Sequence, residues 1–483
     1  MRHAAALLIA ALLGGMAFGQ TSESARKIPI TTSSMEARNA YLKGQDLLDK
    51  LRTNEARSLL DQAISKDPNF AAAYLLRAQT ATTAKEFFSD LKSAGAASGK
   101  VSEGERLMIR ASEAFASSKS LEGGEDLQKL VAAYPGDERA HETLGGYYQN
   151  MQQYDKAIAE QQKAVELNPD FAPAYNLLGY TFRDAQKNKE AEAAFRKYIQ
   201  LISDEPNPYD SLAELLMKMG RFDESIENYG KALSLDPHFS SSYRGIAADL
   251  MYQDKHKEAL EELQKEYDHA LGDGDRQDAL LNMAYCYVDE GKVPEALEQI
   301  SKLSAMSERQ GDKAAMAVDE DTRGYLLFNT GKIDEARGAF AKSLELANQS
   351  AVPEATKKSF ALGIDGRMAL VASAKGDFEN AKKQAEAVRT GFKAMGNPTQ
   401  VQAAHQIMGI IALDQKHYDE AISHLTHANL QSPYVMFQFA KAYTGKKDAE
   451  KAADYYHKAA DANILPTLEY AMVRKQAKEA LAK

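Results

Sequence analysis

Residues 144–169 read LGGYYQNMQQYDKAIAEQQKAVELNP, and residues 178–203 read LGYTFRDAQKNKEAEAAFRKYIQLIS. The two stretches begin 34 residues apart. Each has Leu-Gly at its start, an aromatic ring four positions after the Leu, and Ala thirteen positions after it. Pro169 and Pro237 lie two such periods apart. Because several residue types keep one period, the sequence indicates a structural repeat.

Each 34-residue unit divides into two amphipathic segments of about a dozen residues, which predict two helices. Small residues at Gly145 and Ala157 allow the two helices to approach closely, whereas larger side chains there would push them apart. Pro169 ends the second segment because proline cannot continue a helix. Gln152 and Gln186 mark the tight turn between the helices of their units. The sequence therefore predicts a chain of helical hairpins.

These residues resemble the tetratricopeptide repeat family, whose units carry Leu-Gly, an aromatic residue, Ala and Pro at these spacings. About nine units match well and about three match marginally, and together they cover nearly all of the chain after its start. The resemblance implies an all-α, right-handed superhelical solenoid of stacked antiparallel helix pairs. The positions that define the repeat are Gly44, Ala56, Pro68, Gly145, Ala157, Pro169, Gly179, Ala191, Pro237, Ala259, Gly324, Ala336, Gly409, Ala421 and Pro433.

The spacing of the repeats is looser after residue 260, where successive Ala positions lie 37, 40 and 45 residues apart. Either longer helices and loops, or a domain boundary near residues 271–276, would explain the looser spacing. Residues 93–99 form a run of small residues that predicts a loop. The predicted organisation is a signal peptide at 1–19, a disordered linker at 20–34, an N-terminal array at 35–270, a less regular C-terminal array at 271–465, and a capping helix at 466–483.

The first residues have a charged start, an uncharged run of Ala, Leu, Ile and Gly, and small residues before Gln20, which is typical of a secretory signal. We expect an exported protein, periplasmic or secreted, without stable membrane insertion after cleavage; an uncleaved anchor is the alternative. The net charge of −10 argues against nucleic-acid binding, which needs a basic surface. The single cysteine, Cys286, excludes an intrachain disulfide.

The resemblance also implies a concave groove lined by the first helix of each pair. Mapped onto this chain, the groove residues are Glu142, Asn150, Asn176, Tyr180, Arg183, Asp210, Glu214, Arg244, Tyr252, Tyr285, Asp321 and Tyr325. Polar side chains with recurring Tyr suit an extended peptide. The face is rather acidic, which favours a partner with basic character. The clustered Lys and Arg with which some family members bind a C-terminal carboxylate are not found at these positions.

The sequence contains no nucleophile elbow, P-loop or zinc-protease motif, so we predict a protein that is not an enzyme and needs no cofactor. The predicted function is a protein–protein interaction scaffold of the cell envelope that binds a protein or peptide segment. One alternative is a glycan- or small-ligand-binding solenoid, since aromatic faces stack on sugars. Another is a metal-dependent protein that uses His417, His424 and His427, although their place beside Ala421 favours ordinary packing.

Overall fold

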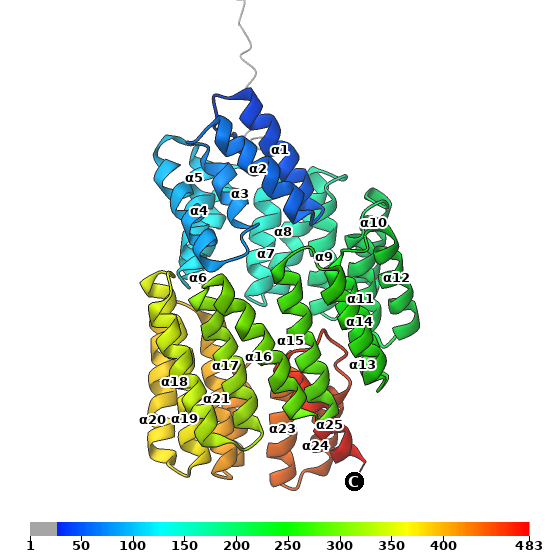
Figure 1. Ribbon diagram of the computed structural model, residues 1–483, viewed down its shortest axis with the longest axis vertical. Helices are drawn as coiled ribbons and strands as arrows, with labels where there is room; N and C mark the ends of the chain where they lie inside the picture. The colour runs from blue at the N-terminus through cyan, green and yellow to red at the C-terminus, as the bar shows by residue number, and fades with distance from the viewer. Residues whose placement is uncertain (1–26, 483) are drawn as a thin grey trace, which may run out of the picture.

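The computed structural model describes residues 27–482, and it is entirely helical over that range apart from loops and turns. The predicted signal peptide and residues 20–26 of the predicted linker lie outside the described residues. The helices form pairs, and the pairs wind into a superhelix whose first turn is drawn from blue to green and whose second turn runs from green to red (Figure 1). Within residues 27–482 there are twelve helix pairs and one final helix, so the predicted all-α solenoid is confirmed.

The first superhelical turn contains seven pairs. Its helices are α1 (Met35–Asp49), α2 (Thr53–Lys66), α3 (Ala71–Ala78), α4 (Ala84–Ala97), α5 (Glu103–Ala116), α6 (Ser120–Ala133), α7 (Glu138–Asn150), α8 (Tyr154–Leu167), α9 (Ala172–Asp184), α10 (Asn188–Leu201), α11 (Asn207–Lys218), α12 (Phe222–Leu235), α13 (Ser240–Tyr252) and α14 (His256–His269). Residues 93–97 belong to α4, so the prediction of a loop at 93–99 was wrong over those residues: Ala94 is fully buried against the neighbouring pairs.

Over the part of the chain that the structure describes, the second superhelical turn contains eleven helices, of which the first seven are longer than those of the first turn and the last four are not. The eleven helices are α15 (Asp273–Glu290), α16 (Val293–Gln310), α17 (Lys313–Asn329), α18 (Ile333–Gln349), α19 (Glu354–Ala374), α20 (Phe378–Ala394), α21 (Pro398–Asp414), α22 (Tyr418–Leu425), α23 (Pro433–Gly445), α24 (Ala449–Ala460) and α25 (Leu468–Leu481). The looser spacing of the repeats after residue 260 is therefore explained by longer helices. None of the helices in residues 27–482 is both long enough and apolar enough to span a membrane.

The small residues that define the repeat lie where two helices of a pair meet. Ala157, Ala191 and Ala336 are fully buried. A Cβ atom added at Gly179 would lie 2.5 Å from Cε1 of Phe195 on the second helix of the same pair. Such a distance is shorter than van der Waals contact, so only glycine permits the observed approach of α9 and α10.

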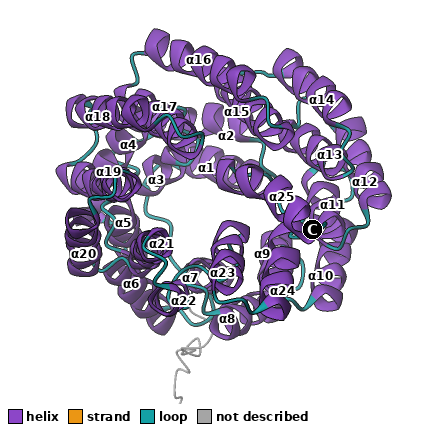
Figure 2. Ribbon diagram, turned by 90° about the horizontal axis from the view of Figure 1, so that it is seen from below, coloured by secondary structure: helices purple, strands orange, loops and turns teal. Residues whose placement is uncertain are grey.

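Hydrogen bonds join the two superhelical turns at positions seven pairs apart. The Asp312 carboxylate accepts from the backbone N–H of Ala84 at 3.3 Å, and Thr356 Oγ1 donates to the carbonyl of Ala116 at 3.0 Å. Gln152 Nε2 donates to Asn429 Oδ1 at 3.0 Å. The second turn therefore stacks directly on the first, and Figure 2 shows the helices as a ring about the common axis.

The array of helices is continuous across residues 271–276, where a domain boundary was one of the two predicted explanations of the looser spacing. Helix α14 packs against α15 as the other consecutive helices pack, and Arg276 donates to the carbonyl of Ala270 at 3.0 Å across the junction. Gly272 caps the N-terminus of α15. The Gly-Asp stretch at 272–275 is thus a helix start within one uninterrupted solenoid.

The sequence predicts that the last helix caps the end of the stack. In the structure, this helix, α25, also packs against the inner face of the solenoid. It packs on α24 and α23, and it also lies against α15 and α17, which are inner helices of the same superhelical turn (Figure 2). Tyr470, Val473 and Ala477 form one face of α25 and are buried in the core that these helices share. The helix turns inward because this apolar face finds a matching surface there rather than at the open end.

The segment 27–34, predicted as part of a disordered linker, is an ordered extended segment. Its Ile28 N–H donates to Asp137 Oδ2 at 2.9 Å, and its Thr31 N–H donates to Glu105 Oε1 at 2.9 Å. Thr32 Oγ1 donates to Asp67 Oδ2 at 2.5 Å. Acidic groups at three successive inter-pair junctions thus hold the main chain and the threonines of this segment.

Candidate functional site

The inner surface of the solenoid is formed by the first helix of each pair, as the repeat pattern predicts. Contacts run directly between α7 and α9, between α9 and α11, and between α11 and α13 (Figure 2). The second helix of each pair lies outside. Side chains at corresponding positions of successive first helices therefore meet in rows, although they are about one repeat apart in the sequence.

One row brings together three of the predicted groove residues on α9 and α11. Tyr180 Oη donates to Glu214 Oε2 at 3.0 Å, and the Arg183 guanidinium lies over the Tyr180 ring at 4.6 Å from its centroid. Arg183 also forms an ion pair with Glu214. Burial, and then the neighbouring carboxylates, raise the pKa of Tyr180 well above its usual value, so its hydroxyl stays a donor.

Two acidic side chains on this inner face, Glu142 and Asp210, form no ion pair within residues 27–482, unlike Glu214. Burial raises the pKa of Asp210 to about 7, although Ser242 Oγ donates to its Oδ1 at 2.7 Å. Burial likewise raises the pKa of Glu142 to about 7, against the opposing effect of Arg139. On the next unit, Arg244 pairs with Asp278 at 3.2 Å. A ligand that carries positive charge would relieve the cost of keeping Glu142 and Asp210 ionised here.

Two other predicted groove residues lie toward the edges of this surface. Asn176 is half-buried, and its Oδ1 has no hydrogen-bond partner in residues 27–482. Asn150 is exposed and lies at the junction between the two superhelical turns, where it lines a cavity of about 690 Å³ together with amide side chains such as Gln402 and Gln406.

Helix α25 covers part of the predicted groove. Tyr252 is 6% exposed, its hydroxyl donates to the carbonyl of Ile464, and the Arg474 guanidinium lies 5.0 Å from its ring centroid. Tyr285 is half-buried, and burial raises its pKa to about 12. Tyr252 is therefore a packing residue rather than an accessible groove residue.

Tyr325 and Asp321, on α17, are likewise engaged inside the protein. Tyr325 is 3% exposed, and the Arg367 guanidinium from α19 lies 4.1 Å from its ring centroid. Arg367 also pairs with Asp321 at 3.3 Å. The inner face of the second turn thus differs from that of the first: its predicted groove residues hold neighbouring helices together.

A buried ion pair fastens α25 to the inner face. Arg474 is 3% exposed, and its Nη1 lies 2.8 Å from Oδ2 of Asp289 on α15. His256 Nε2 lies 2.8 Å from the same oxygen, and Arg474 Nη2 donates to the carbonyl of Tyr252 at 3.0 Å. The sequence analysis missed this contact. A usable signal was present, because the apolar face of α25 contains an arginine, which has to find a partner when buried.

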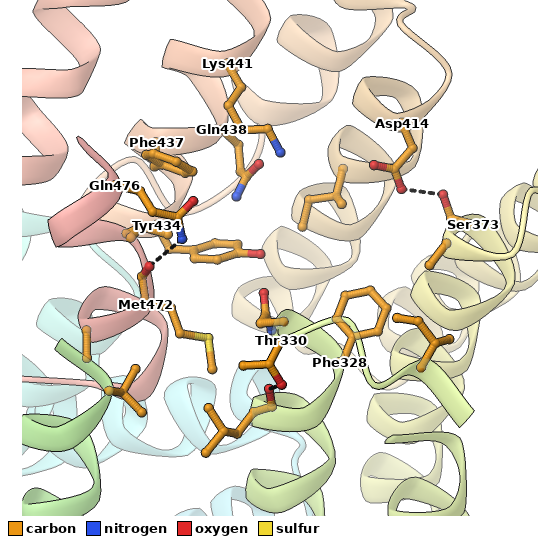
Figure 3. Close-up of a pocket in the computed structure, with 18 of the residues that line it drawn as sticks. Phe328, Thr330, Ser373, Asp414, Tyr434, Phe437, Gln438, Lys441, Met472 and Gln476 are labelled. Atoms are coloured by element: carbon orange, nitrogen blue, oxygen red, sulfur yellow. Dashed lines mark hydrogen bonds between the residues drawn. The ribbon is translucent and has the colours of Figure 1, made fainter. Parts of the chain in front are cut away.

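A second cavity, of about 730 Å³, lies where α15, α17, α19, α21, α23 and α25 come together (Figure 3). Phe328, Phe437 and Met472 provide apolar walls, and Asp414, Gln438 and Lys441 provide polar groups. The sequence analysis did not identify this site. Its one signal was that α23 is apolar on nearly all sides, which is typical of a helix surrounded by others.

Two of the three histidines predicted as alternative metal ligands, His424 and His427, lie together beside His405, with ring centroids 5.5 Å and 5.1 Å from that of His405. His417 faces Glu420, with its Nδ1 3.2 Å from Oε2. His424 instead approaches His405 on α21, with 3.3 Å between the two Nδ1 atoms. Burial lowers the pKa of both His405 and His424, so each favours the neutral form. Over residues 27–482, no group of three or more His, Cys, Asp or Glu side chains is arranged to hold a metal ion.

Cys286 lies in the packed interior of the second turn. Its side chain is 2% exposed, and burial raises the pKa of its thiol to about 12. A thiol with so high a pKa stays protonated at neutral pH and is a poor nucleophile.

Family comparisons agree with the repeat pattern. Models described as tetratricopeptide repeat match residues 41–87, 138–171, 172–205 and 206–239. The chain contains tetratricopeptide repeats. These matches lie in the first superhelical turn, where the 34-residue period is most regular. A search of curated proteins found no match to the chain.

Solved structures of other repeat proteins resemble parts of this tetratricopeptide array. A tetratricopeptide repeat protein from Parabacteroides merdae ATCC 43184 is 16% identical, with a TM-score of 0.36 over 59% of this chain and 99% of that one. MamA is 23% identical, with a TM-score of 0.29 over 33% of this chain and 93% of that one. YrrB, described as a TPR protein with an unusual peptide-binding site, is 19% identical, with a TM-score of 0.26 over 38% of this chain and 94% of that one. At these scores the resemblance carries no argument about function.

Proposed function

We propose that this protein is an exported, non-catalytic interaction scaffold of the cell envelope, which binds a basic protein or peptide segment against the inner face of its first superhelical turn. The tetratricopeptide fold supports a role in protein–protein interaction in general terms. The observation that carries the finer proposal is the inner face of α7 to α11. There, burial raises the pKa of Glu142 and Asp210 to about 7, and neither side chain forms an ion pair with any residue in 27–482.

The segment 27–34 supports this mode of binding, because it is an extended stretch of chain already held by the repeats. Its backbone N–H groups donate to the carboxylates of Asp137 and Glu105, and Lys27 pairs with Glu138. Ile28 packs against the core that includes Leu107. Acidic side chains thus accept hydrogen bonds from the main chain of this segment and pair with its lysine, and an apolar side chain packs beside them. A basic, extended partner would need the same kinds of contact.

In-cell photo-crosslinking tests the proposal. A photoreactive amino acid replaces Asn176 on the inner face, and the matched control replaces Glu227, which is exposed on the outer helix α12. We expect one specific protein partner to crosslink at position 176 and not at position 227. The pair of substitutions Glu142→Gln and Asp210→Asn should abolish that crosslink, because it removes the charge that attracts a basic segment. Equal crosslinking at both positions, or a partner that is indifferent to the two substitutions, would contradict the proposal.

Fractionation of cells of the same strain tests where the protein is located. We expect the protein in the exported fraction, shortened by removal of residues 1–19. A protein of full length that stays with the membrane fraction would instead support the uncleaved anchor.

A further inference from the structure

Two polar side chains of α23 line the cavity beneath α25. Gln438 is 3% exposed, yet its Oε1 has no hydrogen-bond partner in residues 27–482. Lys441 lies one helical turn further along α23, and within the same residues its ammonium group forms no hydrogen bond or ion pair. Figure 3 shows both side chains extending from α23 toward the cavity. A buried amide oxygen without a donor is costly, so a bound group that donates to it would be favoured.

Opposite charges face this cavity without meeting. Burial lowers the pKa of Lys441, and the Asp414 carboxylate counteracts that effect, so the two charges sense each other. The two side chains nevertheless form no ion pair, for which their charged atoms would have to lie within 4.0 Å. Ser373 Oγ donates to Asp414 Oδ2 at 2.6 Å and holds that carboxylate in place at the α21 side of the cavity (Figure 3). A Lys and an Asp that are held apart in this way suit a ligand with a negative and a positive group of its own.

Apolar side chains from several helices form much of the remaining wall. Leu326 is fully buried on α17, Phe437 is 7% exposed on α23, and Met472 lies on α25. Phe328 faces the same space from α17 (Figure 3). A concave site with apolar walls and a few convergent polar groups is typical of small-molecule binding.

We propose that this cavity binds a small zwitterion with an apolar side chain, of the α-amino-acid class. Its carboxylate pairs with Lys441, its ammonium group donates to Asp414 and to Gln438 Oε1, and its side chain packs against Phe328, Phe437 and Met472. The site lies in the second superhelical turn, apart from the inner face of α7 to α11, so this inference is independent of the proposed peptide binding.

The bound ligand would be linked to the docking of α25. Met472 and Gln476 of α25 form one wall of the cavity, and α25 is held in place by the Arg474–Asp289 pair. A ligand that contacts this wall binds only when α25 is docked, so its binding stabilises the docked position of α25 on the inner face.

Isothermal titration calorimetry with L-phenylalanine and L-leucine tests the proposal on the full mature chain. N-acetyl-L-phenylalanine, which lacks the ammonium group, and L-phenylalaninamide, which lacks the carboxylate, serve as chemical controls. We expect L-phenylalanine to bind and each control compound to bind at least about tenfold more weakly, since each loses one of the two charge-assisted contacts. The absence of binding by either amino acid at about 10 mM would overturn the proposal.

Variants then place the binding in this cavity. Lys441→Met should weaken L-phenylalanine binding about tenfold or more and remove the preference for the free carboxylate over the amide. Asp414→Asn should also weaken L-phenylalanine binding, and it should remove the preference for the free ammonium group over the acetylated compound. The control is Lys383→Met, which changes an exposed lysine on the outer helix α20 and should leave binding unchanged.

Binding that is unaffected by both Lys441→Met and Asp414→Asn would place the ligand elsewhere and overturn the proposal. If either variant unfolds, the other still tests one end of the ligand, and hydrogen exchange of the unmodified protein gives a separate readout. There, L-phenylalanine should slow exchange in α25, and exchange in α25 that does not change on binding would also count against the site.

Discussion

The two superhelical turns use the same contact between paired helices but differ in helix length and in what occupies their inner face. Most helices of the first turn have 12 to 15 residues, whereas α15 to α21 have 17 to 21. The small residues Ala157 in the first turn and Ala336 in the second are both fully buried. The repeat therefore fixes the point where the helices of a pair touch, and the length of the helices beyond that point is free to vary.

The inner faces differ more than the pairs do. In the first turn the inner face of α7 to α11 carries buried acidic groups, and the segment 27–34 crosses only the edge of the turn. In the second turn α25 lies on the inner face, and the cavity remains beside it. The same architecture thus leaves an inner face for a partner in one turn and forms a cavity between helices in the other.

The largest expected effect comes from Arg474→Met, which breaks the contact that closes the second turn. It leaves the buried Asp289 carboxylate with the His256 side chain as its remaining partner within ion-pair distance, and we expect a loss of about 3 to 5 kcal/mol in the free energy of unfolding. Hydrogen exchange should rise in α15, α17 and α25 and change little in α5 to α9. Denaturant unfolding with exchange mass spectrometry measures both quantities.

The paired control for that substitution is Arg474→Met combined with Asp289→Leu, which should recover most of the lost stability because no buried charge remains. Uniform exchange changes in both turns would show that α25 stabilises the whole solenoid instead of the second turn alone.

The next comparison is between one buried aspartate in each turn. Asp249 in α13 is fully buried, and burial raises its pKa to about 8, whereas Asp319 in α17 accepts from Ser307 Oγ at 2.7 Å and burial raises its pKa to about 6. A carboxyl whose pKa is raised by folding binds its proton more tightly in the folded state. It therefore lowers stability progressively as the pH rises from about 4 to its folded-state pKa.

We expect Asp249→Asn to stabilise the protein by about 2 kcal/mol at pH 8, with a gain that shrinks toward pH 4. Asp319→Asn should give a smaller gain, one that stops growing near pH 6. Urea unfolding of both variants between pH 4 and pH 8 measures the difference. A gain from Asp249→Asn that does not depend on pH would show that the carboxyl group is not the cause.

The contact shared by both turns is tested at Gly179 and Gly324. An added Cβ would lie 2.5 Å from Phe195 at the first position and 2.7 Å from Phe340 at the second. Alanine at either position should cost about 1 to 2 kcal/mol, because the crowding outweighs the gain in helix propensity. Gly338→Ala, in a helix where nothing lies within 4 Å of the added Cβ, should instead stabilise slightly. Unequal costs at the two positions, measured by thermal unfolding, would mean that the turns differ in pair packing as well as in length.

The smallest expected effect concerns the turns within pairs, where one residue has a left-handed backbone. In the pair α9 and α10 of the first superhelical turn this residue is Gln186, with φ of 61°. In the pair α17 and α18 of the second it is Gly331, with φ of 81°. Gly331→Ala should cost about 1 kcal/mol, since a Cβ disfavours that conformation, and Gln186→Gly should gain a few tenths of that amount. Differential scanning calorimetry resolves the two signs. A loss of stability on Gln186→Gly would show that the entropy of the unfolded chain dominates there.

Much of the fold was predictable because the repeat is a local pattern. Ala157, Gly145 and Gln152 lie within one 34-residue unit, and their spacing predicts a helix pair with its turn, as observed. The grouping of Tyr180, Arg183 and Glu214 on one inner face also follows from their equivalent positions in adjacent units. The burial of Tyr252 was not predictable in the same way, since it depends on a helix more than 200 residues away.

The sequence by itself determined the helix pairs, the small residues between them and the stacking of neighbours, because each of these depends on residues close together in the chain. Only the tertiary structure decided where α25 lies, how the segment 27–34 is held and which helices enclose the cavity. Those contacts join residues such as Arg474 and Asp289, which are 185 positions apart, and the accumulated rotation of many pairs brings them together. A small rotation at each pair leaves no mark in any one repeat, so the closure of the second turn can be seen only when the whole superhelix is assembled.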